Sequence, residues 1–341
     1  MSINQINNRI LWIDMAKGYG ILLVIYAHLG VGWDHIWIYT FHMPLFFFLS
    51  GYVFSIKDDF KEFIIRKYRS IIVPYFALGI PMLLFELLRN GQENFSLSWC
   101  IQLVKGFILQ RRMWTLWYIA CLFCMNILFY IIVVTLKKKS KIIVLSIIMT
   151  CIGLCYYKYG GKPLFWNADV CLTAIPFFAL GYMYKNYVTI IDGLLDRKWV
   201  KILLLVLSIT INLVCGMKSL DASLVGLEMF DSKYGNPFYT YLAAFAGIMC
   251  IVIVSKAFVV KPIRYIGENS MLYYAWHQTI FIPIMLKLMS ILEIDCILSY
   301  EVIGNMTYKC IVTLAIVLAI SICNWIIMKM GLGFLVGKTV R

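Results

Sequence analysis

Ten long apolar runs constrain the fold of this 341-residue chain more than any other feature of its sequence. A helix needs about 20 apolar residues to cross the hydrocarbon core of a bilayer. The runs cover residues 12–33, 36–56, 70–88, 116–136, 142–157, 165–184, 202–216, 238–260, 270–292 and 309–330. Charged residues make up only 14% of the chain, against about 25% in soluble domains. The sequence therefore predicts an all-α, polytopic membrane protein with about ten transmembrane helices, forming a single membrane domain over residues 1–341.

Three stretches fit this pattern less well. The fifth and seventh runs, residues 142–157 and 202–216, are short, so their ends are the least certain. Residues 97–110 are apolar but are interrupted by Lys105. We expect an interfacial or re-entrant helix there, with an eleventh span as the alternative.

The basic residues indicate an orientation. The chain carries 31 Lys and Arg against 17 Asp and Glu, a net charge of +14. With ten spans both termini share one side, and the connections on that side hold twice as many basic residues as those opposite. Cytoplasmic connections are enriched in Lys and Arg, so we expect a plasma-membrane protein with both termini in the cytoplasm. The positive charge is then a topology signal, and we expect no binding to nucleic acid.

Most of the eleven cysteines lie within the apolar runs. Cys121 and Cys124 have the C-x-x-C spacing, but no second pair accompanies them. We therefore interpret the cysteines as small packing residues and expect no metal site.

Three ionisable residues lie within the first run: Asp14, Lys17 and His28. An ionisable group inside a span is costly to keep, and it is a candidate functional residue for that reason. Residues 17 and 28 lie on nearly the same face of a helix, and Asp14 lies on that face too. The three side chains are therefore expected to point into a bundle interior or a water-filled cavity. The alternative is an Asp14–Lys17 pair near the cytoplasmic surface and a separate hydrogen-bonded histidine.

Helical geometry separates these groups along the span. His28 lies about 16 Å from Lys17 and about 21 Å from Asp14, so a partner for His28 must come from another helix. His42 is the candidate, because the connection between the first two runs is too short to let their helices separate. We expect His28 and His42 to share a depth and to be catalytic. The alternative for His42 is a hydrogen-bonded histidine that braces the hairpin.

A basic segment precedes the third run, with Arg66 and Arg69 three residues apart. Forked guanidinium groups are well suited to a phosphate-bearing ligand, and we expect this segment to bind one. The alternative is a lipid anchor at the cytoplasmic interface.

Three further residues are weaker candidates. His277, about two turns into the ninth run, is expected to line the same cavity, with a structural role as the alternative. Glu86 and Asp169 lie near the outer ends of their runs, where they could bind a polar substrate. The alternative for each carboxylate is simple exposure at the surface.

Three segments occur in a recognisable order. They are Lys17 followed after ten residues by His28, residues 41–52 with the sequence FHMPLFFFLSGY, and Arg66 and Arg69 ahead of Pro74 and Tyr75. These segments resemble the opening helix, the second helix and the Arg-x-x-Arg motif of the acyltransferase family 3 integral membrane proteins. The first segment is particularly similar to the branch of fucose 4-O-acetylase and related acetyltransferases. Weaker similarities at residues 176–182 and 266–270 extend the resemblance over the chain.

The resemblance implies transfer of an acyl group, usually acetyl from cytoplasmic acetyl-CoA, to a sugar hydroxyl of an envelope glycan. It implies that His28 is catalytic and that Arg66 and Arg69 contact the donor. Lys17 is expected to hold the coenzyme A phosphates with them, and Asp14 and His277 are further candidates for donor contact. His28 would act as a general base on the acceptor or would carry the acyl group.

Ten spans with buried charge also suit a transporter or exporter of an envelope glycan or another anionic solute. Against that alternative, the two halves lack matching pairs of Gly/Pro-interrupted helices. A third hypothesis is a non-catalytic scaffold of a glycan-assembly complex. The partners expected are membrane lipids and a glycan or lipid-linked sugar acceptor, while homo-oligomers and glycan-assembly partners stay open.

Overall fold

The computed structural model describes residues 10–30, 32–57, 59–94, 96–220, 227–292 and 302–337. Within these ranges the backbone is mostly helical and contains no strand. The long helices are α1 (Leu11–Ala27), α3 (His42–Val53), α5 (Val73–Asn94), α7 (Trp117–Leu136), α8 (Lys139–Lys158), α9 (Val170–Leu195), α10 (Lys198–Ser219), α11 (Pro237–Ala257) and α15 (Val302–Lys329). The shorter helices are α2 (Trp33–Tyr39), α4 (Phe60–Lys67), α6 (Leu97–Leu109), α12 (Lys261–Glu268), α13 (Ser270–Trp276) and α14 (Ile282–Ile291).

Seven helical stretches among the described residues are long and apolar enough to cross a membrane. They are Trp33–Val53, Phe60–Asn90, Trp117–Leu136, Lys139–Lys158, Lys198–Ser219, Pro237–Ala257 and Asn305–Lys329. The chain is thus all-helical with several candidate spans, in agreement with the predicted fold class. The count of ten spans and the cytoplasmic termini stay predictions. Of the basic residues used for orientation, Arg9, Lys338 and Arg341 lie outside the described residues.

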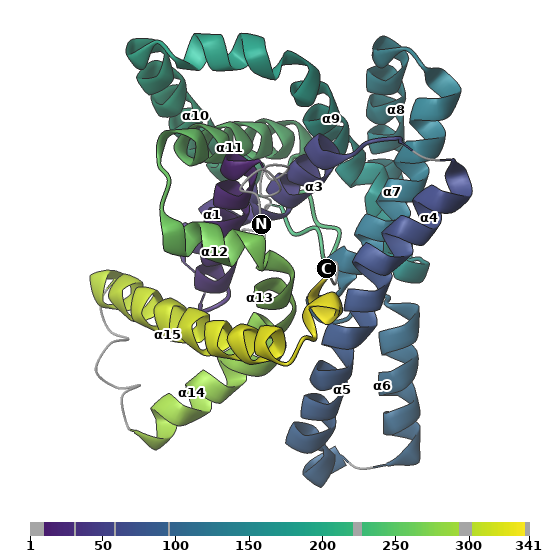
Figure 1. Ribbon diagram of the computed structural model, residues 1–341, viewed down its shortest axis with the longest axis vertical. Helices are drawn as coiled ribbons and strands as arrows, with labels where there is room; N and C mark the ends of the chain where they lie inside the picture. Colours follow the sequence, from purple (N-terminus) through teal and green to yellow (C-terminus); the bar gives the residue numbers. More distant parts are fainter. Residues whose placement is uncertain are drawn as a thin grey trace, which may run out of the picture.

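The two runs that are short in the sequence form full-length helices. Helix α8 has 20 residues and α10 has 22, because each begins at a lysine that lies outside the apolar run. Both are long enough to cross the bilayer. Helix α6 has 13 residues, about 20 Å at 1.5 Å per residue, which is too short to cross alone. It follows α5 in the chain and lies beside it (Figure 1).

Two predicted spans are not continuous α-helices. Residues 36–56 are divided between α2 and α3, with the break at Thr40 and Phe41. Thr40 is buried, and the Asn212 side-chain amide of α10 donates to its hydroxyl at 2.9 Å. The span over residues 270–292 contains a π-helical turn, η4 (His277–Phe281), between α13 and α14. A second π-helical turn, η2 (Tyr68–Ile72), joins α4 to α5. Such turns interrupt the regular helical ladder and are frequent at functional sites.

Helix α1 lies near the centre of the molecule, where it contacts α2, α3, α11, α12, α13 and α15 (Figure 1). Glycines allow the closest of these approaches. A Cβ on Gly267 of α12 would lie 1.7 Å from the Asp14 carbonyl oxygen, and one on Gly18 of α1 would lie 2.1 Å from that of Ile263. Helices α3 and α9 meet through Gly51 and Gly181 in the same way. Small residues let helix backbones pack tightly where no hydrophobic force drives their association.

Candidate active site

Two cavities lie at the two ends of α1. The histidine cavity has a volume of about 540 Å³ and is lined by Val24, His28, Tyr39, His42, Met43, Glu86, Arg89, Trp114, Thr115, Trp117, Leu227, Glu228, Met229, Phe230, Asp231, Tyr274, His277, Gln278 and Thr279. The lysine cavity has a volume of about 450 Å³ and is lined by Ile10, Ile13, Asp14, Lys17, Tyr52, Val53, Ser55, Lys57, Lys185, Gly267, Glu268, Asn269, Ser270, Met271, Val336 and Gly337. The polar face of α1 therefore runs from one cavity to the other, with Lys17 and His28 about 16 Å apart along the helix.

Three histidines from three elements meet in the histidine cavity. His28 caps the end of α1, His42 begins α3 and His277 begins the π-helical turn η4. The rings of His28 and His277 are 5.0 Å apart between centroids and meet edge to face. The ring of Tyr39 lies 4.6 Å from that of His42 and 5.8 Å from that of His28. The structure thus brings His28, His42 and His277 into one cavity.

The hydrogen bonds of these rings define their tautomers. In each histidine Nδ1 lies next to a main-chain carbonyl: His28 to Val24 at 2.8 Å, His42 to Ile38 at 3.2 Å and His277 to Tyr274 at 2.8 Å. A carbonyl oxygen only accepts, so Nδ1 carries the proton in all three rings. Nε2 of each neutral ring then carries the lone pair. The cavity consequently holds three imidazoles whose basic nitrogens are not used by their own helices.

The Tyr39 side chain is the hydrogen-bond partner of His28 Nε2. Its hydroxyl lies 3.3 Å from His28 Nε2 and donates to it. The ring of His35 stacks on Tyr39 at 3.8 Å. At the start of α2, Asp34 forms an ion pair of 2.9 Å with the buried Lys309 of α15. This pair anchors the short helix that presents Tyr39 to His28.

Carboxylates line the same cavity. Glu86 pairs with Arg89 at 3.3 Å and accepts from the Asn90 amide at 2.5 Å. Asp231 and Glu228 belong to the connection between α10 and α11. Burial raises the pKa of the Glu228 carboxyl to about 7, and the neighbouring Asp231 adds to the shift. A proton donor or acceptor that titrates near neutral pH therefore borders the histidines.

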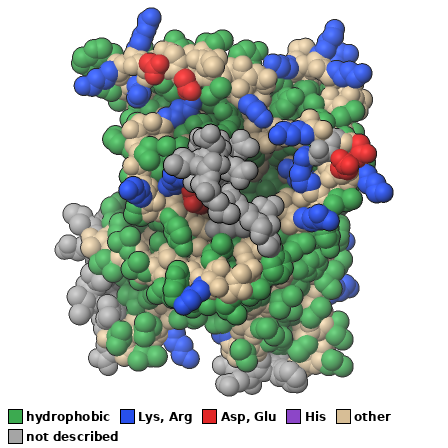
Figure 2. Space-filling model, viewed as in Figure 1, with side chains coloured by type: hydrophobic (Ala, Val, Ile, Leu, Met, Phe, Trp, Pro, Cys, Tyr) green, Lys and Arg blue, Asp and Glu red, His purple; other side chains and the backbone are tan. Residues whose placement is uncertain are grey.

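Basic side chains from three segments line the lysine cavity. Lys17 is half-buried on α1, Lys57 follows α3, and Lys185 of α9 donates to the Phe54 carbonyl at 3.4 Å. Asp14 is buried and lines the same cavity. Figure 2 shows Lys and Arg side chains around a hollow near the middle of the face viewed in Figure 1. The cavity is suited to an anionic group of a ligand.

Arg66 and Arg69 are not among the residues that line the lysine cavity. Arg66 ends α4 and donates to the carbonyl of Ser55, a lining residue, at 3.5 Å. Arg69 is exposed and lies within η2, where the π-helical turn changes the angle between residues three apart. Their contact with a ligand stays a prediction.

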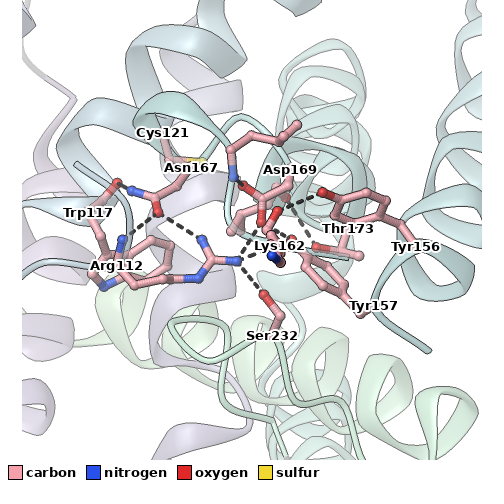
Figure 3. A network of polar contacts seen from close by, with 12 residues as sticks. Arg112, Trp117, Cys121, Tyr156, Tyr157, Lys162, Asn167, Asp169, Thr173 and Ser232 are labelled. Atoms are coloured by element: carbon pink, nitrogen blue, oxygen red, sulfur yellow. Dashed lines mark hydrogen bonds and ion pairs between the residues drawn. The ribbon is translucent and has the colours of Figure 1, made fainter. Parts of the chain in front are cut away.

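Asp169 is buried, whereas the alternative to substrate binding that we considered for it was simple exposure at the surface. It is 1% exposed and pairs with Arg112 at 2.5 Å, while it also accepts from the Tyr157 hydroxyl and the Leu164 amide (Figure 3). The Arg112 guanidinium also donates to Asn167 and to Ser232. Asp169 does not line the histidine cavity. These contacts favour a structural role, whereas Glu86 does line the cavity.

Several site residues were not predicted. Tyr39 is three residues before His42, and this spacing was a usable signal. Glu228, Arg112 and the Asp34–Lys309 pair gave no local signal, because each acts on residues far away in the sequence. In the part of the chain that is described, no group of three or more His, Cys, Asp or Glu is arranged to hold a metal ion.

Comparisons with known proteins support one family. The model of the family described as "Acyltransferase domain" matches residues 10–327 of the chain. The nodulation protein NolL of Mesorhizobium japonicum is 27% identical over 223 residues, which cover 58% of this chain and 54% of that protein. The chain thus spans about half the length of this curated relative. No solved structure matches the chain significantly.

Proposed function

Because the chain belongs to the acyltransferase family whose model covers residues 10–327, we propose that it is a membrane-embedded O-acetyltransferase. It moves an acetyl group from cytoplasmic acetyl-CoA to a sugar hydroxyl of a cell-surface polysaccharide or of its lipid-linked precursor. The protein lies in the plasma membrane with ten spans, and both termini are in the cytoplasm.

The observation that carries this proposal is the pair of cavities at the two ends of α1. One end offers ammonium groups for phosphates, and the other offers histidine nitrogens for proton transfer. The helix separates Lys17 from His28 by about 16 Å, a distance that suits an extended arm between a nucleotide and its thioester. The donor enters from the lysine cavity and the acceptor from the histidine cavity.

At the donor end, Lys17, Lys57 and Lys185 supply positive charge inside the lysine cavity. Arg66 donates to the carbonyl of Ser55, which lines this cavity, and Arg66 and Arg69 add their charge to the donor end. Arginine adds the fork that binds a phosphate through two parallel hydrogen bonds. Asp14 lines the same cavity and is placed to accept from the donor's polar groups.

At the acceptor end, the sugar hydroxyl replaces the Tyr39 hydroxyl at His28 Nε2, and this nitrogen takes its proton as the oxygen attacks the thioester carbonyl. The C–O bond of the acetyl ester forms, and the C–S bond breaks with its electron pair leaving on sulfur. The imidazolium of His28 returns the proton to the thiolate, giving coenzyme A and the acetylated sugar. His42 and His277 help to hold this site, and Trp114, Trp117 and Phe230 offer flat surfaces to the sugar.

The experiment that tests the function measures free thiol released from acetyl-CoA by the purified protein with glycan acceptors. Release that depends on the acceptor supports the proposal, and mass spectrometry of the host's surface glycan with and without the gene product identifies the acetylated sugar. Absence of release with every acceptor, together with substrate-dependent uptake into vesicles, would indicate the transporter instead.

Donor binding is tested separately by isothermal titration with coenzyme A. Lys17→Ala and loss of either arginine should each weaken binding by about 1.5–3 kcal/mol, the range of hydrogen bonds to charged groups. Arg66→Lys and Arg69→Lys should restore binding only partly, since lysine keeps the charge but not the fork. A lipid anchor predicts unchanged affinity and poor membrane stability in these variants. Identical binding curves for all variants and the wild type would place the donor elsewhere.

A further inference from the structure

Three carboxylates line the histidine cavity, and they differ in their partners. Glu86 pairs with Arg89, and Asp231 pairs with Lys233 at 2.9 Å. Glu228 has no hydrogen bond or ion pair to its carboxylate from any residue in the described ranges. It is therefore the carboxylate that a bound molecule finds free to accept hydrogen bonds.

The segment that carries Glu228 is held firmly in place. Glu228 and Lys233 exchange two main-chain hydrogen bonds, of 2.8 and 2.9 Å. Between them, Ser232 accepts from the half-buried Arg112 in the network of Figure 3. The Thr240 hydroxyl donates to the Tyr234 carbonyl at 2.6 Å. The position of the Glu228 backbone at the cavity wall is thus set by the pairing with Lys233 and by contacts from two other segments.

A second group in the cavity also points to a ligand. His277 has an exposed fraction of 0%, and its Nε2 has no hydrogen-bond partner among the described residues. Leaving a buried polar atom without a partner costs about 1–3 kcal/mol. A hydroxyl of a bound molecule would satisfy this nitrogen, as another would satisfy the Glu228 carboxylate.

The charges of the cavity restrict what can bind there. Of the described lining residues, Arg89 is the one that carries a fixed positive charge, and it already pairs with Glu86. A carboxylate on the ligand would meet Glu228 without a free cation to offset the repulsion. A neutral hydroxyl or an ammonium group would instead donate to Glu228.

We propose that Glu228 binds the acceptor and makes the histidine cavity select neutral or amino sugars over anionic ones. This inference rests on the proposed transfer of acetyl groups to sugars, and it specifies the acceptor class of that reaction. Glu228 acts here as a binding and specificity residue, while proton transfer stays with His28.

The test uses three acceptors that differ in one charged group: methyl glucoside, methyl glucosaminide and methyl glucuronide. Acceptor-dependent thiol release gives kcat/KM for each with the full-length protein. The wild type should prefer the glucoside and the glucosaminide to the glucuronide by at least about tenfold, or about 1.4 kcal/mol. In Glu228→Gln the ratio of glucoside to glucuronide should fall to within about twofold of one, mainly through a lower KM for the glucuronide. Asp196→Asn, which removes one exposed carboxylate outside both cavities, should keep the wild-type ratio.

Two outcomes separate the inference from the function on which it rests. Active wild-type protein that accepts all three sugars equally, or a ratio unchanged in Glu228→Gln, overturns the inference and leaves acetyl transfer standing. Absence of acceptor-dependent release in the wild type overturns the sugar acceptor itself. Coenzyme A titration at the lysine cavity checks that Glu228→Gln is folded. If that variant is lost, Glu228→Asp must keep the discrimination, because it retains the charge.

Discussion

At the scale of single residues, the chemistry depends on which ring nitrogen of each histidine faces the cavity. His28, His42 and His277 each use Nδ1 on a main-chain carbonyl three or four residues earlier in the chain. A helical histidine reaches the carbonyl of the preceding turn without any other partner, so this arrangement is local. It leaves Nε2 basic in a buried site, where a proton acceptor is most useful.

Replacing His28 by alanine should abolish acetyl transfer, lowering kcat by about a hundredfold or more, the usual scale of general-base catalysis. Coenzyme A affinity should stay within about twofold, because the donor nucleotide binds at the other end of α1. His42→Ala should lower kcat by less. Thiol-release kinetics and isothermal titration measure the two effects. Near-wild-type turnover of His28→Ala would remove His28 from the mechanism, and equal losses would make His42 its full partner.

The discrimination against anionic acceptors should increase with pH. The Glu228 pKa is raised from 4.5 to about 7, mainly by burial and also by the charge of Asp231, while Lys233 acts in the opposite direction. Because the pKa is raised, about a tenth of this carboxyl is ionised at pH 6 and about nine tenths at pH 8. The ratio of kcat/KM for methyl glucoside to methyl glucuronide should rise over this interval in the wild type and stay flat in Glu228→Gln.

The other titratable or charged groups lining the cavity are His28, His42, His277, Tyr39, Tyr274, Glu86, Arg89 and Asp231. A rise of the same size in the variant would assign the titration to one of them.

At the scale of elements, the helices that carry the site are the interrupted ones. His42 follows the break between α2 and α3, and His277 begins the π-helical turn η4. Glycines at the contact let α1 and α12 pack so closely that there is no room for a methyl group between them. Interrupted helices expose polar groups that regular helices keep bonded, and tight packing around them holds those groups in place.

Gly267→Ala should destabilise the protein by about 1–3 kcal/mol, as overpacking does, because its Cβ would lie 1.7 Å from the Asp14 carbonyl oxygen. The thermal midpoint in detergent should fall by several degrees. Gly193→Ala is the matched control: this glycine is in α9, and a Cβ there meets nothing within 4 Å. Alanine is favoured over glycine inside helices by about 0.5–1 kcal/mol, so the control should be slightly stabilised. Equal midpoints for both variants would mean that α1 and α12 separate easily.

At the scale of the whole molecule, the two cavities divide the reaction between the two ends of one central helix. Contacts over long sequence distances build the end that holds the histidine cavity. Lys309 reaches Asp34, and Arg112 joins α9 to the segment that carries Glu228. The Lys309–Asp34 and Arg112–Asp169 ion pairs are mostly shielded from water, and leaving one half of such a pair without its partner is strongly unfavourable.

The proposed topology places the two cavities on opposite faces of the membrane. Two single-cysteine substitutions report on the two cavities: Lys57→Cys at the lysine cavity and Asp231→Cys at the histidine cavity. In intact cells an impermeant maleimide should label position 231 and not position 57, and permeabilised cells should show both. Mass spectrometry of the labelled peptides distinguishes these positions from the native cysteines. Labelling of both positions in intact cells would contradict the orientation expected from the basic residues.

The sequence by itself determined the helical class, the places of most spans and the polar face of α1. These features depend on hydrophobicity and helical spacing, which are read within one segment. It also allowed His28, His42 and His277 to be chosen, because an ionisable group in an apolar run is visible without any neighbour. Only the tertiary structure decided the contact of Thr40, at the break between α2 and α3, with Asn212, and the place of Arg69 outside the cavity lining. It alone brought Glu228 to the histidines and buried Asp169 against Arg112. The physical reason is that these outcomes depend on contacts between segments far apart in the chain, and local hydrophobicity and spacing carry no record of such contacts.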